Sequence, residues 1–396
     1  MSRGIARSRN DTPILSDPQS QSSGRLWSLD ALRGFDMFWI IGGEELIRAL
    51  AKLTENSTFI ELANKHTDHP EWHGFTLYDC IFPLFMFIAG VAIPYSFASH
   101  LARGQGSLAL HLRVIRRGIL LFLLGLVING ALAFNFSLHF DQLADGTRHL
   151  VTDFSHIRFP SVLGRIGIGY TFAALIVLHT KPRNQLLTCI GLLIGYWAAL
   201  KFIPVPGFEK GNFFPGQNLG DYIDRHLLPG HLYRTFRDPE GLFSAIPSIA
   251  TVLIGVMAGH WLRRGEFGGA AKAAGLAIAG VVCIAAALAW DRTFPINKNL
   301  WTSSFVLMTS GISLVLLSVF YLVIDVWQIR GWAFFFVVIG VNAITVYVGQ
   351  RIINFDELAT LVFSHHLHGV LRECGGLFLK WIVLFFLYKQ RIFLRV

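Results

Sequence analysis

The chain has 396 residues, of which 53% are hydrophobic and only 15% are charged. Soluble domains carry about 25% charged residues, so this composition and the repeated long apolar runs exclude an ordinary soluble protein. The net charge of +9 does not indicate nucleic-acid binding, because Lys and Arg form short clusters between the apolar runs. We therefore expect an all-α bundle of transmembrane helices in the lipid bilayer, with no nucleic-acid partner.

The first 28 residues are polar and basic and contain no apolar core of the kind that a signal peptide requires. They are predicted to form a disordered cytoplasmic tail, followed by a single membrane domain over residues 29–396. In that domain, ten segments are apolar and long enough to cross a bilayer, which takes about 20 residues. The predicted spans are residues 30–52, 76–98, 114–135, 160–180, 185–204, 242–262, 271–290, 301–324, 332–351 and 373–390.

The distribution of Lys and Arg predicts that both termini lie in the cytoplasm. With the N-terminus inside, the inside loops are short and basic, whereas outside loops such as residues 205–241 are longer and mix both signs. Most of the 15 histidines then fall on the outer face. The group His365, His366 and His368 lacks the ligand spacing of a zinc site, so we interpret it as a solvated loop and expect no metal. The four cysteines are widely spaced and are interpreted as packing residues.

Several charged residues fall inside the predicted spans, where each costs roughly 2.5–3.5 kcal/mol at the bilayer centre. Such residues persist when they are paired or line a cavity. Asp30 and Arg33, three residues apart at the inner end of the first span, favour a local ion pair. Asp79 in the second span and Arg165 in the fourth lie at matched depth, which indicates an ion pair or a polar cavity. Because polar residues occur at both membrane faces, the pattern is typical of a path through the protein.

Seven stretches, spread over nearly the whole chain beyond residue 28, carry a resemblance to a known family. They are LDALRGFDMFWIIGG (29–43), HPEWHGFTLYDCIFPLFMFIAG (69–90), RIGIGYTF (165–172), DYIDRHLL (221–228), DPEGLFSAIPSI (238–249), INKNLW (296–301) and NAITVYVG (342–349). In this order they resemble the transmembrane acetyltransferase family of heparan-alpha-glucosaminide N-acetyltransferase and its bacterial relatives. The resemblance implies transfer of acetyl from cytoplasmic acetyl-CoA to the amine of a glucosamine-type sugar on the periplasmic side of a bacterial inner membrane. It also implies a homodimer.

The resemblance assigns the catalytic role to His69, which forms the family's H-x-x-W-x-G pattern with Trp72 and Gly74. The functional Asn that the family carries at the outer end of the first helix is absent here, where Gly42, Gly43, Glu44 and Glu45 stand. Glu44 is expected to take over as a polar contact or a base.

The remaining candidate residues follow from the chemistry of acetyl transfer beside this resemblance. The imidazole of His69 can remove a proton from the amine or carry the acetyl group itself, and both routes stay open. Asp79 is expected to orient His69 or to bind the sugar. Arginines suit the phosphates of CoA, and the predicted contacts to acetyl-CoA are Arg33, Arg117 and Asn342. The predicted substrate-binding residues are Trp72, Arg165, Asp238, Glu240, Asn297 and Asn299.

Two alternatives remain. The same histidine would serve an O-acetyltransferase of a cell-surface glycan. A transporter of amino sugars or peptidoglycan fragments would instead require inverted repeats and helices that break near the midplane. The sequence shows no convincing internal repeat, and each predicted span reads as one continuous helix.

Overall fold

The computed structural model describes residues 26–131, 140–142, 148–150, 158–355, 357–359 and 370–393. Apart from loops, these residues are helical except for two short strands, β1 (Phe140–Gln142) and β2 (Arg148–Leu150), which pair antiparallel. The predicted all-α class is confirmed. The predicted tail lies largely outside the described residues, and His365, His366 and His368 lie wholly outside them.

Six helices of the described part of the chain are long and apolar enough to cross a membrane. They are η3 with α4 (Leu77–Ala102), α6 (Val162–His179), α7 (Pro182–Phe202), α9 (Ala245–Leu262), α10 (Gly269–Asp291), and α11 (Ser303–Phe320) with η6 (Tyr321–Val326). Each coincides with a predicted span. Helices α5 (Ser107–Leu126) and α15 (Val370–Lys389) also coincide with predicted spans. They are not among the six helices that combine sufficient length, high hydropathy and few charged residues. The total of ten spans therefore stays a prediction.

The first and ninth predicted spans are broken helices, so the expectation of continuous helices was wrong there. The first consists of α1 (Trp27–Phe38), a π-helical turn η2 (Trp39–Gly43) and α2 (Glu44–Leu53), with Gly42 at φ 137°. Because side chains strongly disfavour that conformation, glycine permits the break. The ninth consists of α12 (Ala333–Val341) and α13 (Ala343–Ile352), which meet at Asn342 with a bend of 69°.

Glycines let the central helices touch backbone to backbone. A Cβ added at Gly90 of α4 would collide with the carbonyl of Val252 in α9, and one added at Gly255 would collide with the carbonyl of Phe87. Gly34 of α1 and Gly340 of α12 form a similar contact. Small residues allow this close approach, which is a main source of helix association in membranes.

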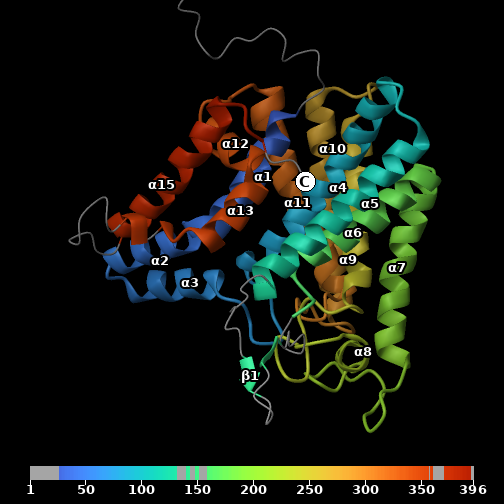
Figure 1. Cartoon of the computed structure of the whole chain (residues 1–396). Helices are drawn as coiled ribbons and strands as arrows, with labels where there is room; N and C mark the ends of the chain where they lie inside the picture. Colours follow the sequence, from blue (N-terminus) through green and yellow to red (C-terminus); the bar gives the residue numbers. More distant parts are fainter. Residues whose placement is uncertain are drawn as a thin grey trace, which may run out of the picture.

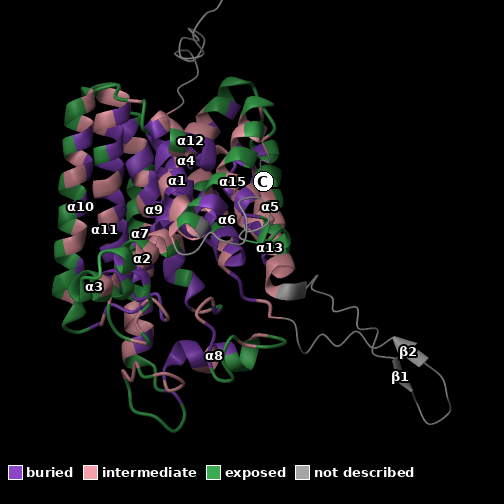
Figure 2. Ribbon diagram, turned by 90° about the vertical axis from the view of Figure 1, so that its left-hand side faces the viewer, coloured by how far each residue is buried: buried purple, intermediate pink, exposed green. Residues whose placement is uncertain are grey.

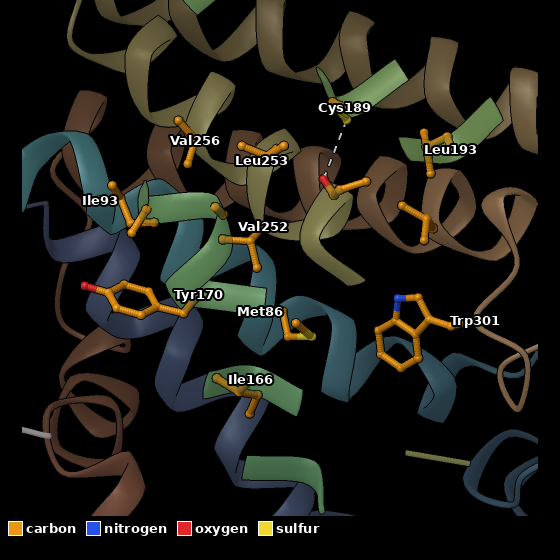
Figure 3. Close-up of a cluster of buried hydrophobic side chains, with 14 of the residues drawn as sticks. Met86, Ile93, Ile166, Tyr170, Cys189, Leu193, Val252, Leu253, Val256 and Trp301 are labelled. Carbon is orange, nitrogen blue, oxygen red and sulfur yellow. Dashed lines mark hydrogen bonds between the residues drawn. The ribbon is translucent and has the colours of Figure 1, made fainter. Parts of the chain in front are cut away.

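The core lies between the central helices, and the outer helices present apolar faces to the surroundings. Figure 3 shows the largest buried cluster, in which Met86, Tyr170, Val252 and Trp301 pack between α4, α6, α9 and the start of α11. Figure 2 shows buried residues concentrated in α1, α4 and α9, while α10 is largely exposed. Its exposed face includes four large apolar residues: Ile278, Val281, Val282 and Leu288. A soluble protein rarely exposes such a surface, so it supports a position in the bilayer.

One end of the bundle carries most of the ordered loop structure. Figure 1 shows α8 (Leu219–Leu227) below the bundle and α2 with α3 (Ser57–Thr67) on its lower flank. The interpretation of the cysteines as packing residues fits Cys80 and Cys189, which are buried, whereas Cys283 is half-buried and Cys374 is exposed.

Candidate active site

A cavity of about 820 Å³ opens among α1, α2, α4, α6, α13 and α15. Its apolar walls come mainly from Ile and Phe side chains, and charged groups interrupt them. The charged and titratable residues of the lining are Glu44, Glu45, His69, Tyr78, Glu240, Lys298, Tyr347, Arg351, Glu373 and Lys380. A pocket with apolar walls and a few convergent polar groups is the usual form of a site for a small molecule.

His69 reaches this cavity from the loop between α3 and η3, and its side chain remains 46% exposed. Its Nδ1 lies 2.7 Å from Oδ1 of Asp79, a carboxylate that is fully buried. The other oxygen of Asp79 accepts hydrogen bonds from the backbone N–H of Thr76 (3.0 Å) and from its hydroxyl (3.2 Å). Thr76 and Asp79 thereby form a capping box at the start of η3. This cap fixes the carboxylate, and the carboxylate in turn fixes the histidine ring.

Lys298 completes the cluster from the turn between α10 and α11. Its Nζ lies 3.0 Å from Nε2 of His69, 3.1 Å from Nδ1 and 3.3 Å from Oδ1 of Asp79. Burial lowers the pKa of the Lys298 ammonium, although the negative charge of Asp79 acts in the opposite direction. The turn is held by Asn297, whose Oδ1 accepts from the Leu300 N–H at 3.0 Å and whose own N–H donates to Thr302 Oγ1 at 3.0 Å. Asn297 therefore positions Lys298 and is not part of the cavity lining.

Glu240 brings a second charged group to the same cavity. It is held by Arg158, which also makes two hydrogen bonds to the buried Asp238 at 2.6 and 2.7 Å. Burial opposes the charge on Arg158, but the hydrogen bond to Asp238 and the charge of Glu240 raise its pKa overall. Asp238 also accepts from the backbone N–H of Glu240 at 3.0 Å. Of the two predicted carboxylates, Glu240 faces the cavity and Asp238 supports it.

Arg165 does not pair with Asp79, so the ion pair that their depth suggested is wrong. The guanidinium of Arg165 donates to the carbonyl of Pro239 at 2.7 Å and to the hydroxyl of Ser244. It also lies 4.8 Å from the centre of the Trp301 ring. These contacts tie α6 to the start of α9. Trp301 itself is fully buried in the core.

The wall of the cavity that α15 forms is hydrogen-bonded to the break in the first helix. The buried Nζ of Lys380 in α15 donates to the carbonyl of Ile41 at 2.8 Å, next to Gly42. The break removes this carbonyl from the regular helical pattern, so the lysine supplies the hydrogen bond that it needs. Glu44 and Glu45 then follow on α2, beside the cavity.

The remaining predicted residues are not part of the cavity lining. Trp72 donates from Nε1 to the carbonyl of Phe213 at 2.9 Å, and Asn299 is half-buried in the turn beside Lys298. Arg33 forms the expected ion pair with Asp30 at 3.3 Å. Arg117 lies over the ring of Tyr170, 4.4 Å from its centre. Asn342 is buried at the bend between α12 and α13.

Sequence reasoning missed Lys298 and Arg158. Lys298 stands inside the INKNLW stretch that carried the resemblance, but only the two asparagines beside it were predicted to bind the substrate. It is 229 residues from His69 along the chain, so no spacing argument joins them. Arg158 precedes the fourth predicted span and could have been paired with the acidic DPE sequence at 238–240, but only by assuming their proximity. In the described residues, no group of three or more His, Cys, Asp or Glu side chains is arranged to hold a metal ion.

Comparison with known proteins identifies relatives for most of this chain. The family described as "Heparan-alpha-glucosaminide N-acetyltransferase, catalytic" matches residues 25–289. The heparan-alpha-glucosaminide N-acetyltransferase of Mus musculus is 30% identical over 387 residues, which cover 83% of this chain and 56% of the mouse protein. The protein of that name from Homo sapiens is 29% identical over 385 residues, covering 83% of this chain and 55% of its own. The chain thus spans about half the length of these relatives, and the resemblance expected from the motifs is confirmed.

Proposed function

The chain belongs to the heparan-alpha-glucosaminide N-acetyltransferase family, and from this premise we propose that it transfers the acetyl group of acetyl-CoA to the amine of a glucosamine-type sugar. The observation that carries the proposal is the cluster of His69, Asp79 and Lys298 at a cavity large enough for a small molecule. It combines a proton acceptor, a carboxylate that orients it, and a cation.

The geometry suits His69 to the role of general base. When Nδ1–H donates to Asp79, Nε2 carries the lone pair and takes a proton from the attacking amine. The amine nitrogen forms a bond to the carbonyl carbon of the thioester, the bond from carbon to sulfur breaks, and CoA leaves as the thiolate, which takes up a proton. The ammonium of Lys298 stabilises the negative charge that develops on the carbonyl oxygen. In the second route, Nε2 itself attacks the thioester and passes the acetyl group to the amine.

The carboxylates of the cavity suit an acceptor that carries an amine. Glu44, Glu45, Glu240 and Glu373 line it together with the cations Lys298, Arg351 and Lys380, which offset most of the negative charge. The proposed contribution of the carboxylates is therefore local: one of them binds the ammonium group of the amino sugar and takes its proton before the amine attacks. In this proposal Glu44 keeps the contact role expected from the sequence, and Tyr78, whose ring lies 5.0 Å from that of His69, is the residue between them.

We also propose a sidedness, in which the acetyl donor enters from the cytoplasm and the acceptor from the periplasm of a bacterial inner membrane. The basic loops at residues 103–117 and 263–272 support it, since Lys and Arg concentrate in cytoplasmic loops. Arg33 and Arg117 belong to that side and are the proposed contacts for the phosphates of CoA.

One observation favours a second candidate function. A transporter requires broken helices, and the structure contains breaks at Gly42 and at Asn342. An amino-sugar transporter would use the same acidic cavity without covalent chemistry. It would have no need for acetyl-CoA, so binding of CoA separates the two functions.

The experiment that tests the proposal measures transfer of label from radioactive acetyl-CoA to glucosamine by the protein purified in detergent. The wild type is expected to label the sugar, and His69→Ala is expected to lose that activity while it still binds CoA. His73→Ala, in the same loop, is the matched control and should retain activity, because His73 lines a separate pocket with residues 207–214. A His69→Ala variant with wild-type turnover would contradict the proposal. Absence of CoA binding by the wild type would move the transporter to first place.

Label that stays on the protein when the acceptor is withheld would select the route through an acetylated histidine. If the protein carries no label under those conditions, direct transfer to the amine is the route.

A further inference from the structure

The bend between α12 and α13 contains an amide side chain that no described residue satisfies. Asn342 ends α12 and precedes α13, and only 1% of its surface is exposed. Neither its Nδ2 nor its Oδ1 has a hydrogen-bond partner among the described residues. Because a buried polar atom without a partner is destabilising, an amide that lacks partners at both ends is expected only where another group pairs with it.

Other polar atoms without partners lie on the helices around this bend. They are Oγ1 of Thr345 in the first turn of α13, Oγ of Ser310 in α11, and both carboxylate oxygens of Asp36 in α1. Helix α1 packs against α11, α12 and α13. Helices α1 and α12 touch at Gly34 and Gly340. Asp36 lies two residues after the first of these glycines, and Asn342 lies two residues after the second. Several buried hydrogen-bond donors and acceptors in one group of neighbouring helices therefore have no partner among the described residues.

The bend adjoins the cavity that holds His69. Ile344 and Tyr347 of α13 line that cavity, and so do Met37 and Ile41 of the helix that carries Asp36. A molecule that extends from the cavity between these helices would meet apolar walls interrupted by isolated polar groups. That pattern suits a long, narrow and mostly apolar chain that carries a few amides.

The group that best complements an asparagine side chain is another amide. Its N–H donates to Oδ1 and its carbonyl accepts from Nδ2, so both unsatisfied atoms are paired at once. We propose that the bend between α12 and α13 is the subsite for the pantetheine arm of the acetyl donor, where Asn342 pairs with one of the two pantetheine amides. The proposal rests on the proposed acetyl-CoA-dependent function. It gives Asn342 a specific contact, away from the phosphates of CoA.

The test compares binding of CoA, pantetheine and adenosine 3′,5′-bisphosphate to the wild type and to Asn342→Leu. Leucine has the same branched arrangement of side-chain heavy atoms as asparagine, although it is larger, and it cannot form the hydrogen bonds. The dissociation constants of CoA and pantetheine should rise about tenfold, the loss expected for one buried hydrogen-bonded group. That of the bisphosphate, which has no pantetheine, should not change. Without ligand, the melting temperature of Asn342→Leu should equal or exceed that of the wild type, because an unsatisfied buried amide has been removed.

Two results would overturn the subsite. One is unchanged binding of CoA and pantetheine by Asn342→Leu. The other is an equal loss for all three ligands with a lowered melting temperature, which would show that Asn342 supports the bend itself. If Asn342→Leu does not fold, Asn342→Ala is subjected to the same comparison. Failure of the wild type to bind CoA would instead remove the proposed function, and the subsite with it, so the two failures are distinguishable.

Discussion

Two residues that are close in the sequence and one that is distant from them form a charged cluster at the cavity. His69 comes from a loop, Asp79 from the start of a membrane helix, and Lys298 from a turn much later in the sequence. Each controls the others, since the carboxylate orients the ring and offsets the charge of the lysine. Removing any one of them takes away a hydrogen-bond or ion-pair partner of the other two.

Substituting Lys298 tests whether its cation acts in the reaction. In Lys298→Met, turnover should fall by about 10²–10³-fold, the effect of removing one group that stabilises an oxyanion. Lys298→Arg keeps the charge and should recover part of the activity. Steady-state kinetics of acetyl transfer provide the measurement, and Lys210→Met, in an exposed loop, is the control. Equal turnover for Lys298→Met and the wild type would remove the lysine from the mechanism.

Asp224 of α8 should make stability depend on pH. Burial raises its pKa to about 7, although hydrogen bonds from the backbone N–H groups of Phe243 and Leu242 act in the opposite direction. In the unfolded chain a carboxyl titrates near pH ~4. Between about pH 4 and 7 the folded protein holds a proton that the unfolded chain has lost, so the free energy of unfolding falls as the pH rises through this window. Above about pH 7 the carboxyl of Asp224 is ionised in both the folded and the unfolded chain, so it no longer changes the free energy of unfolding as the pH rises.

The variant Asp224→Asn keeps the acceptor oxygen and removes the titration. Its melting temperature should match that of the wild type near the lower end of the window and exceed it at pH 8. Thermal unfolding in detergent at both pH values measures the difference, and Asp68→Asn, at an exposed carboxylate, should show no such trend. The same difference between Asp224→Asn and the wild type at both pH values would refute the assignment.

At the scale of elements, the close crossing of α4 and α9 depends on glycines. Gly90→Ala would force a methyl group against the carbonyl of Val252, so the helices must separate or shift. We expect a loss of about 1–3 kcal/mol, typical of an overpacked interior. Gly191→Ala on α7 is the matched control, because a Cβ there meets open space. The melting temperatures of Gly90→Ala and Gly191→Ala are compared, and equal values would show that the crossing of α4 and α9 accommodates a methyl group.

The breaks in two helices mark the limit of sequence reasoning about elements. An apolar run is a local property, so the six long helices were predicted close to their observed ends. The break at Gly42 also has a local signal in the Gly42-Gly43 pair, but it is completed by Lys380, more than three hundred residues later. Asn342 lies inside the ninth predicted span, and nothing nearby in the sequence indicates a bend of 69°.

The candidate site was predictable only where a motif joins neighbouring residues. His69 and Asp79 stand ten positions apart within one recognised stretch, and their expected contact is present at 2.7 Å. Lys298 and Arg158 reach the site through folding of the whole chain, so the sequence offered no distance on which to choose them. The predicted depth of Arg165 did not identify its partners, because depth alone does not determine the direction in which a side chain points.

For the molecule as a whole, the proposed orientation is open to a labelling test. In a Cys374→Ser background, Glu209→Cys should react with a membrane-impermeant maleimide in intact cells, and Glu266→Cys should react only after permeabilisation. Both positions are exposed, so access across the membrane decides the outcome. The background protein without a new cysteine is the control. The reverse pattern would invert the topology and with it the side from which each substrate arrives.

The hydrogen bond from Lys380 to Ile41 also has a consequence for biogenesis. The ribosome makes Ile41 339 residues before the lysine that satisfies its carbonyl. Until α15 is inserted, the carbonyl of Ile41 lacks this partner and one wall of the cavity is missing. Assembly of the cavity therefore waits for the synthesis of α15, and a nascent chain that stops before α15 has no complete cavity.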